Sequence, residues 1–292
     1  MHLLVQACIL GLLTGGVYAL MASGLTLAFG VMRVVNVAQG ALIVLGAYLS
    51  HSLFVGPGID PFVSILIMTP VAFALGVGLQ LAFLRPLRSD EREQLSLLVT
   101  WAVALGIEGV LSLVYKTTYR STITSYANRS WSVGGYVISE VRVFGFATSL
   151  GILTLLYLIL ARSRFGRSVR ATIQNPVSAE LLGIDPQRVA AIGFGLAVAT
   201  ATAAGAVYGI VFSFNPGSHY DLISRLLTII VLGGLGSLGG AVVASLVVGV
   251  SESVLAAEIS PTWASLTFFL VLIAVLVLRP QGLFGRVERG AL

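Results

Sequence analysis

The sequence predicts an all-α polytopic membrane protein, a helical bundle of about eight to nine transmembrane segments with interrupted helices. Composition is the first reason: 57% of the 292 residues are hydrophobic and only 10% are charged, whereas soluble domains carry about 25% charged residues. The mean hydropathy of +0.98 agrees with this. Segregation of charge is the second reason, since long uncharged stretches lie between the charged residues and reach the roughly 20 residues that a membrane-crossing helix needs.

The apolar stretches, divided at their polar breaks, define the expected segments. We expect helices rather than barrel strands, because backbone groups in the hydrocarbon core must pair within their own segment, and barrel strands give short alternating patterns. Residues 1–32 contain no Lys or Arg, which favours a retained first helix over a cleaved signal peptide. The predicted segments are 3–24, 36–54, 62–84, 95–115, 143–161, 189–212, a short 222–233, 238–255 and 263–278.

The basic residues predict the orientation, because positively charged loops favour the cytoplasmic side. The net charge of +5 is therefore interpreted as an orientation signal and not as a nucleic-acid footprint. The N-terminus is expected outside and the C-terminus inside, provided that 222–233 crosses or nearly crosses; if it dips in and returns, eight spans remain and the last two invert. The expected cytoplasmic set is Arg33, Arg85, Arg88, Arg92, Arg162, Arg164, Arg167, Arg170, Arg188, Arg279, Arg286 and Arg289, and the external set is Lys116, Arg120, Arg129, Arg142 and Arg225.

Several chemistries are excluded by what the chain does not contain. Its only lysine is Lys116, and no Gly-Lys pair exists for a phosphate-binding loop. Its three histidines form no HExxH motif, and Cys8 is the only cysteine, so no His–Cys metal cluster and no intrachain disulfide are expected. We therefore predict no catalytic residues, no metal and no cofactor, within a single membrane domain covering residues 1–292.

The first interrupted segment, 29–40, breaks the apolar run at Gly30, Arg33, Asn36, Gln39 and Gly40. Amide side chains at membrane depth are tolerated where they face protein or a water-filled cavity. Asn36, Gln39 and Gly40 are therefore predicted to line a solute pathway. The alternative is that the two amides only cap the start of a helix.

The second interruption is the run from Gly233 to Gly240, which has five glycines in eight residues and formally contains GxGxxG. No βαβ pattern surrounds it, so dinucleotide binding is rejected. Glycines permit positive φ and close backbone approach, as a tight turn between helices or a broken helix requires. We place Gly233, Gly234 and Gly236 on the pathway; a plain loop is the alternative.

Small residues and isolated carboxylates complete the membrane part. The pairs Gly11/Gly15 and Gly205/Gly209 are predicted to let helices pack closely. Glu108 and Glu252 lie near the outer ends of their segments. Either they couple transport to protons or they are hydrated carboxylates that snorkel to the interface. The loop 116–142, with turn residues Asn128, Gly134 and Gly135, suits an external excursion.

The polar segment 162–188 is predicted to be cytoplasmic and to contain a short helix. Pro176 suits the first turn, Asn175 the N-cap and Gly183 the C-terminal end. Such a helix of about 7 residues is about 10 Å long and would show Val177, Leu181 and Leu182. It is predicted to be a docking element for a cytoplasmic partner.

Four motifs carry a resemblance to a known family. FGRSVRATIQNPVSAELLGIDPQRV resembles the coupling loop of ABC importer permeases, in the form found in the branched-chain amino acid permease family, LivH type. GLTLAFGVMRVVNVAQGALIVLGAYLS, VLGGLGSLGGAVVASLVVGVSES and LRPQGLFGR are similar to that family too, in the right order, from about residue 10 to 286. Family members often have His at the position of Gln39 and an acidic residue at the position of Ala41.

The resemblance implies the ABC importer permease fold and a multi-pass subunit of the bacterial inner membrane. Its implied partners are a second homologous permease, two cytoplasmic ATP-binding subunits that use the ATP, an extracytoplasmic solute-binding protein and the lipid bilayer, without nucleic acid. By position, the ATPase contacts would be Arg170, Asn175, Ala179, Glu180 and Gly183. Branched-chain amino acids are the implied substrate; urea, short amides or another small polar solute form the alternative. A stand-alone channel or ion-coupled carrier is the remoter one, but it has no evident need for 162–188.

Overall fold

Every predicted segment is a helix in the computed structural model, which describes residues 2–87, 92–127, 129–278, 282 and 284. Between these segments in the sequence, the chain also forms the two helices of the polar segment 162–188 and a short β-hairpin. The elements are α1 (His2–Met32), α2 (Gln39–Val55), α3 (Pro61–Leu79) with its π-helical continuation η1 (Gln80–Leu84), α4 (Arg92–Tyr115), β1 (Ser130–Val133), β2 (Tyr136–Ser139), α5 (Glu140–Arg162), α6 (Arg164–Gln174), α7 (Pro176–Leu181), α8 (Pro186–Val211), α9 (Ser218–Gly233), α10 (Leu238–Glu258) and α11 (Pro261–Leu278).

The chain has the all-α polytopic membrane fold that its composition predicts. Among the described residues, six helices are long and apolar enough to cross a bilayer: α1, α3 with η1, α4, α5, α8 and α10. Two shorter apolar helices, Gln39–Val55 and Phe268–Leu278, add to them. The predicted segment 222–233 lies in α9, which belongs neither to the six long helices nor to the two shorter apolar ones. Asp221 and Arg225 interrupt the apolar sequence of α9.

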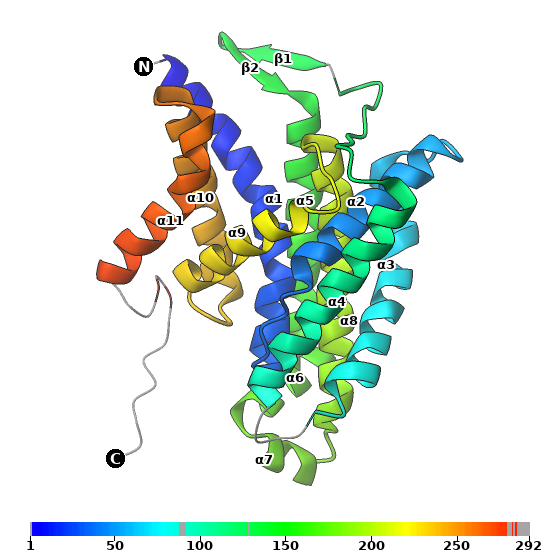
Figure 1. Ribbon diagram of the computed structural model, residues 1–292. Helices are drawn as coiled ribbons and strands as arrows, with labels where there is room; N and C mark the ends of the chain where they lie inside the picture. The colour runs from blue at the N-terminus through cyan, green and yellow to red at the C-terminus, as the bar shows by residue number, and fades with distance from the viewer. Residues whose placement is uncertain (1, 88–91, 128, 279–281, 283, 285–292) are drawn as a thin grey trace.

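The two ends of the bundle differ, as Figure 1 shows. One end, called here the hairpin end, carries His2 and the antiparallel strands β1 and β2, which turn through Gly134 and Gly135 at φ of 59° and 86°. The other end, the α7 end, carries α6 and α7. The excursion predicted for 116–142 is thus confirmed as an extended loop with a hairpin, although its predicted turn residue Asn128 lies outside the described residues.

Small residues bring the central helices into backbone contact, as predicted. A Cβ atom at Gly11 would lie 2.6 Å from the Cα of Val250, and one at Gly15 would lie 2.8 Å from the carbonyl oxygen of Ser245. The pair Gly205/Gly209 packs in the same way on α2, where a Cβ at Gly205 would clash with the Ile43 carbonyl. These contacts leave no room for larger side chains. They join α1 to α10 and α2 to α8.

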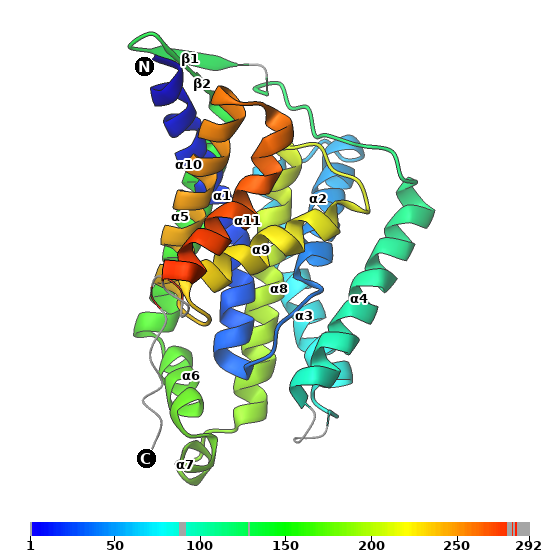
Figure 2. The same cartoon turned by 60° about the vertical axis from the view of Figure 1, so that its left-hand side comes forward.

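The path of α9 shows that the chain crosses the bundle between α8 and α10. The C-terminal parts of α8 and α10 both lie beside the first half of α1. For α8, a Cβ at Gly145 of α5 would contact both Val17 and Val207. For α10, a Cβ at Gly11 would contact Val250. The segment between them must therefore run from the hairpin end towards the α7 end. Figures 1 and 2 show α9 lying obliquely across the middle of the bundle. The segment 222–233 therefore runs away from the hairpin end and does not return to it.

Two details of the first interruption differ from the prediction. Helix α1 continues to Met32 instead of ending near residue 24, so Gly30 lies inside a helix. Gly24 is not a helix end: its site is small because the Gln39 side chain and the Ala197 carbonyl of α8 press against it. The actual break is the segment 33–38, which begins at Arg33 with a φ of 54°.

The described basic residues divide between the two ends largely as predicted. The α7 end holds Arg33, Arg85, Arg162, Arg164, Arg167, Arg170 and Arg188, and the hairpin end holds Lys116, Arg120, Arg129 and Arg142. Arg225 is the exception: it lies within the bundle on α9, where it pairs with Glu252. Arg88, Arg279, Arg286, Arg289 and the side chain of Arg92 lie outside the described residues, as does most of LRPQGLFGR.

Candidate functional site

The N-terminal turns of α2 and α9 meet inside the bundle. A Cβ at Gly40 would lie 2.6 Å from the carbonyl oxygen of His219 and 3.3 Å from the Cβ of Ile223. Both helices begin well away from the two ends, because Gln39 reaches the carbonyl of Met21 in α1 and His219 reaches Glu108 in α4. The predicted interruption before α2 therefore faces a second interrupted helix. Glycine at position 40 is what permits the close contact.

Asn36 and Gln39 are buried in this junction, both at 0% exposure. Asn36 Nδ2 donates to Gln39 Oε1 over 3.3 Å, and Gln39 Nε2 donates to the Met21 carbonyl over 3.4 Å. Asn36 Oδ1 has no hydrogen-bond partner among the described residues. A void of about 10 Å³ lies beside Asn36, which is room for about one water molecule. The conformation is closed at this level.

The alternative role of these amides, capping of α2, does not describe the structure. The N-cap of α2 is Ala38, and no side chain makes a cap hydrogen bond there. The two amides instead bond each other and α1. Buried polar groups normally have partners, so an acceptor left open is a feature to explain.

Glu108 belongs to a small polar cluster on the other side of the junction. Its Oε2 lies 3.0 Å from His219 Nε2 and accepts a hydrogen bond of 3.0 Å from Tyr220 Oη. The side chain of His219 is only 3% exposed and that of Glu108 is 24% exposed. Glu108 therefore fixes the first turn of α9 to α4, and it is neither isolated nor fully hydrated.

The glycine run forms a tight turn between α9 and α10, as predicted. Gly234 and Gly236 have φ of 91° and 79°, which other residues rarely adopt. Gly233 ends α9, and a Cβ there would lie 2.5 Å from the carbonyl carbon of Gly240. Gly236 lies near Gly30, where a Cβ would be 3.7 Å from its carbonyl oxygen. The turn thus sits against the last part of α1, less than one turn of helix before the break that leads to Asn36.

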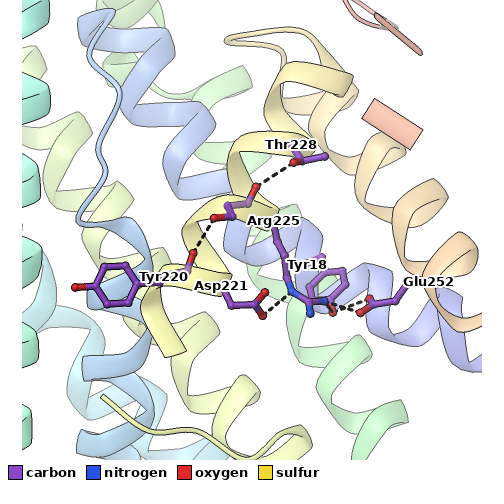
Figure 3. A network of polar contacts seen from close by, with 7 residues as sticks. Tyr18, Tyr220, Asp221, Arg225, Thr228 and Glu252 are labelled. Atoms are coloured by element: carbon purple, nitrogen blue, oxygen red, sulfur yellow. Dashed lines mark hydrogen bonds and ion pairs between the residues drawn. The ribbon is translucent and has the colours of Figure 1, made fainter. Parts of the chain in front are cut away.

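The sequence interpretation missed a charged network at the centre of the bundle, drawn in Figure 3. Arg225 Nη1 donates to Glu252 Oε1 over 2.5 Å and to Tyr18 Oη over 3.1 Å, and Arg225 Nε donates to Asp221 Oδ2 over 2.7 Å. Tyr18 Oη in turn donates to Glu252 Oε2 over 2.9 Å.

The network corrects two expectations. Arg225 was predicted outside, but its side chain is only 15% exposed and its guanidinium also lies 4.4 Å from the ring centroid of Phe268. Glu252 is not a snorkelling carboxylate, because its side chain is only 17% exposed and is paired with Arg225. The available signal was the spacing of Asp221 and Arg225, one helical turn apart in an otherwise apolar segment.

A cavity of about 730 Å³ opens at the hairpin end and reaches this network. Along α1 its lining runs from Leu3, which is 70% exposed, to Tyr18, which is 4% exposed; at about 1.5 Å per residue this is a length of about 22 Å along the helix. Asp221, Leu222 and Arg225 of α9 form its base. Because Gly40 packs against His219 and Ile223, α9 separates this hairpin-end cavity from the sealed amide pair.

A second cavity of about 450 Å³ lies at the α7 end. It is lined by the end of α1 with Arg33, by the end of α6 and by the start of α8. The two cavities share no lining residue. The bundle thus has a cavity at each end, and packed side chains separate the two cavities.

The polar segment 162–188 has the local structure predicted for it. Asn175 caps α7, its Oδ1 accepting from Ser178 N over 3.0 Å, Pro176 opens the helix, and Gly183 follows its end at a φ of 79°. The apolar side chains of this segment are open to a partner: Val177 is 66%, Leu181 85% and Leu182 79% exposed.

Two predicted contact residues of the segment have roles inside the chain. Ala179 is only 2% exposed, so its side chain packs within the segment and does not face a partner. Arg170 is exposed on one side, yet its Nη1 donates to the Leu160 carbonyl over 2.7 Å, which ties α6 to the end of α5. Asn175, Glu180 and Gly183 are exposed. No group of three or more His, Cys, Asp or Glu side chains that could hold a metal occurs in the described part of the chain.

Comparison with known proteins identifies one family. Residues 8–276 match the family described as "Branched-chain amino acid transport system / permease component". The chain is 29% identical to the high-affinity branched-chain amino acid transport system permease protein BraD of Pseudomonas aeruginosa, over 97% of this chain and 96% of that protein. It is 30% identical to the LivH permease protein of the corresponding system in Escherichia coli K12, over 95% of this chain and 94% of that protein.

Two further matches have lower identity. A probable branched-chain amino acid transport permease protein LivH of Methanocaldococcus jannaschii is 26% identical over 91% of this chain and 88% of that protein. Among solved structures, "PsaBC from Streptococcus pneumoniae in complex with Fab" matches with a TM-score of 0.49 and 13% identity, covering 94% of this chain and 92% of that chain.

Proposed function

Because the chain belongs to the family of permease components of branched-chain amino acid transport systems, we propose that it moves these amino acids along a pathway closed at Asn36 and Gln39. The chain is the multi-pass membrane subunit of an ABC importer, and such a permease component uses no cofactor and has no catalytic domain. The full-length family match carries the proposal.

The pathway runs from the hairpin-end cavity past α9 to the amide pair and on towards the α7 end. Its outer part is the cavity of about 730 Å³, and its closed middle holds Asn36, Gln39 and Gly40. The open acceptor Asn36 Oδ1 supports this assignment, since a passing solute or water can supply the missing donor. Gly233, Gly234 and Gly236 form the inner turn of α9, which has to move when the middle opens.

The proposed assembly contains this permease, a second homologous permease, two cytoplasmic ATP-binding subunits and an extracytoplasmic solute-binding protein. It lies in the bacterial cytoplasmic membrane with eight or nine segments crossing in the ABC importer permease fold. The α7 end faces the cytoplasm, in accord with its larger number of arginines. The binding protein docks at the hairpin end.

The ATPases act on α7, and α6 transmits the motion to α1. The exposed Leu181 and Leu182 give the ATPase an apolar contact, with Asn175, Glu180 and Gly183 beside it. Val169 of α6 is buried in a cluster with Leu27 and Val31 of α1, and burial of one such side chain contributes about 1.5–3 kcal/mol. A displacement of α6 therefore moves the end of α1, from which the chain continues directly to Asn36.

The test is uptake of radiolabelled L-leucine by liposomes that contain the complete transporter, with ATP present or absent on the ATPase side. We expect uptake only with ATP and with the binding protein. Unlabelled L-valine and L-isoleucine are expected to compete, whereas urea and acetamide are not. Equal uptake by liposomes holding this chain alone would contradict the proposal and favour a channel or ion-coupled carrier.

A further inference from the structure

The charges that line the hairpin-end cavity are balanced. Its lining includes two arginines, Arg142 and Arg225, and two carboxylates, Asp221 and Glu252. Their formal charges sum to zero. A dipolar molecule without net charge leaves no uncompensated charge in such a site, whereas an anion or a cation does and should bind less well.

Donor and acceptor atoms remain open at the base of the cavity. Arg225 uses Nε and Nη1 in its hydrogen bonds, and none of the hydrogen bonds between described residues uses its Nη2. Asp221 accepts through Oδ2, and its Oδ1 is likewise unused in the described part of the chain, with the side chain 61% exposed. A guanidinium edge and a carboxylate oxygen, one helical turn apart, are thus available to a small ligand that enters the cavity.

The remaining groups hold Arg225 in place. Glu252 and Tyr18 bind Nη1, and the ring of Phe268 covers the guanidinium at 4.4 Å. Figure 3 shows how Tyr18 of α1, Glu252 of α10 and Asp221 of α9 converge on it from three helices. A cation fixed in this way loses little side-chain entropy when it binds a carboxylate, because a guanidinium is rigid and its position is already set.

The walls of the cavity are apolar and its size suits a small ligand. Leu10 of α1, Leu222 of α9 and Phe212 after α8 line it, with Ala256 on α10. Its volume of about 730 Å³ lies within the range of about 300–1,000 Å³ of pockets that enclose small molecules. An aliphatic side chain can therefore be buried while the charged end of the same molecule reaches Arg225 and Asp221.

We propose that the hairpin-end cavity binds an α-amino acid as its zwitterion, with the carboxylate on Arg225, the ammonium group on Asp221 and the aliphatic side chain against α1 and α10. This rests on the proposed function and deepens it. Recognition of the charged end of the substrate then takes place in the permease itself, before the α9 partition, in addition to any selection by the binding protein.

The direct test is equilibrium binding of radiolabelled L-leucine to the full chain in lipid nanodiscs, without a binding protein or ATPases. Two competitors separate the charges: 4-methylpentanoate lacks the ammonium group, and 3-methylbutylamine lacks the carboxylate. We expect each to compete at least tenfold less well than unlabelled L-leucine. Competition by either one at the same concentration as L-leucine would overturn the zwitterion assignment, as would the absence of L-leucine binding.

Two variants locate the site. Asp221→Asn is expected to weaken L-leucine binding at least tenfold without weakening binding of 4-methylpentanoate, which does not use Asp221. Its control is Glu258→Gln, which removes an exposed carboxylate at the same end but outside the cavity and is expected to have no effect. Ala256→Trp fills the cavity and is expected to abolish binding, whereas Val110→Trp, on the exposed face of α4, is not.

The outcomes separate this inference from the proposed function. Wild-type L-leucine affinity in Asp221→Asn or in Ala256→Trp would overturn the inference, even if the complete transporter imports L-leucine. A complete transporter that does not import L-leucine would instead contradict the proposed function. A folding check by thermal unfolding accompanies each variant, and Asp221→Asn is the safer one because its side chain is largely exposed.

Discussion

Arg225 of α9 and Glu252 of α10 form an ion pair of 2.5 Å inside the bundle, although 27 residues separate them in the chain. Both side chains are shielded, at 15% and 17% exposure. The pair connects the oblique helix α9 to a long helix at the level where the hairpin-end cavity ends.

Removal of one partner of this pair should destabilise the protein. Arg225→Met leaves Glu252 as an unpaired, largely buried carboxylate, which we expect to cost up to about 3 kcal/mol. The double variant Arg225→Met/Glu252→Leu removes both charges and is expected to recover much of that loss. Thermal unfolding in nanodiscs measures both. A double variant less stable than the single one would contradict the pairwise explanation.

Asn36→Leu should impair transport and leave the assembly intact. Leucine has the branched shape of asparagine but is larger, and it removes the Nδ2 donor to Gln39 Oε1, so we expect the stability to fall by about 1–3 kcal/mol without loss of the fold. Uptake of L-leucine by the complete transporter is expected to fall at least tenfold. Normal uptake kinetics would remove Asn36 from the pathway, and loss of folding would show that its role is structural.

Gly40→Ala should disturb the junction of α2 and α9. The new Cβ would lie 2.6 Å from the His219 carbonyl, and overpacking of this kind costs about 1–3 kcal/mol. Unfolding temperature and uptake should both fall. Gly78→Ala is the matched control, because its site in α3 has nothing within 4 Å and alanine is the better helix former. Equal effects of the two changes would contradict the packing argument.

Leu181→Ser/Leu182→Ser should weaken the ATPase contact without unfolding the permease. These side chains are 85% and 79% exposed, so their loss removes little packing within the chain. Co-purification of the ATP-binding subunits and ATP-dependent uptake are expected to fall together, while the unfolding temperature stays within experimental error. Val137→Ser, an exposed apolar residue of β2 at the hairpin end, serves as the control. Unchanged co-purification would place the ATPase contact elsewhere.

The loop at the hairpin end should lose stability at alkaline pH. Burial, and then the hydrogen bond of 2.7 Å that Tyr126 Oη donates to Asp60 Oδ2, raise the pKa of Tyr126 above its ordinary value near 10. The folded state therefore keeps a proton that the unfolded state loses, so this contribution is complete below pH 10 and declines as the pH rises further. Between pH 8 and 11, the unfolding temperature should fall less in Tyr126→Phe than in the wild type. Identical pH profiles would contradict this.

Local signals predicted the helices and the local structure of the polar segment 162–188 well. An apolar segment of membrane length can only pair its backbone internally, so its helix is set by composition. In α7 the cap, the first turn and the end are each set by one residue type, and the structure confirms Asn175, Pro176 and Gly183 in those positions. The glycine run likewise predicted a turn through its tolerance of positive φ.

The charged centre could not be predicted in the same way. Hydropathy treats Arg225 as a break in an apolar run and places it outside, because the partners that stabilise it come from α1, α10 and α11. The predicted end of the first segment near residue 24 was wrong for a related reason: Gly24 lies inside α1, and its small size serves its neighbours in α2 and α8. Pairings between distant segments are decided by tertiary packing, which a local pattern does not contain.

The contact of α1 with α10 limits how the bundle can rearrange. At Gly11, Gly15 and Gly249 the two backbones touch directly, so no layer of side chains lies between them that could repack into a second arrangement. We therefore expect these two helices to move as one rigid body during each transport cycle. The hinges then fall at 33–38 and 234–237, the two short segments where that rigid body is joined to α2 and to α9.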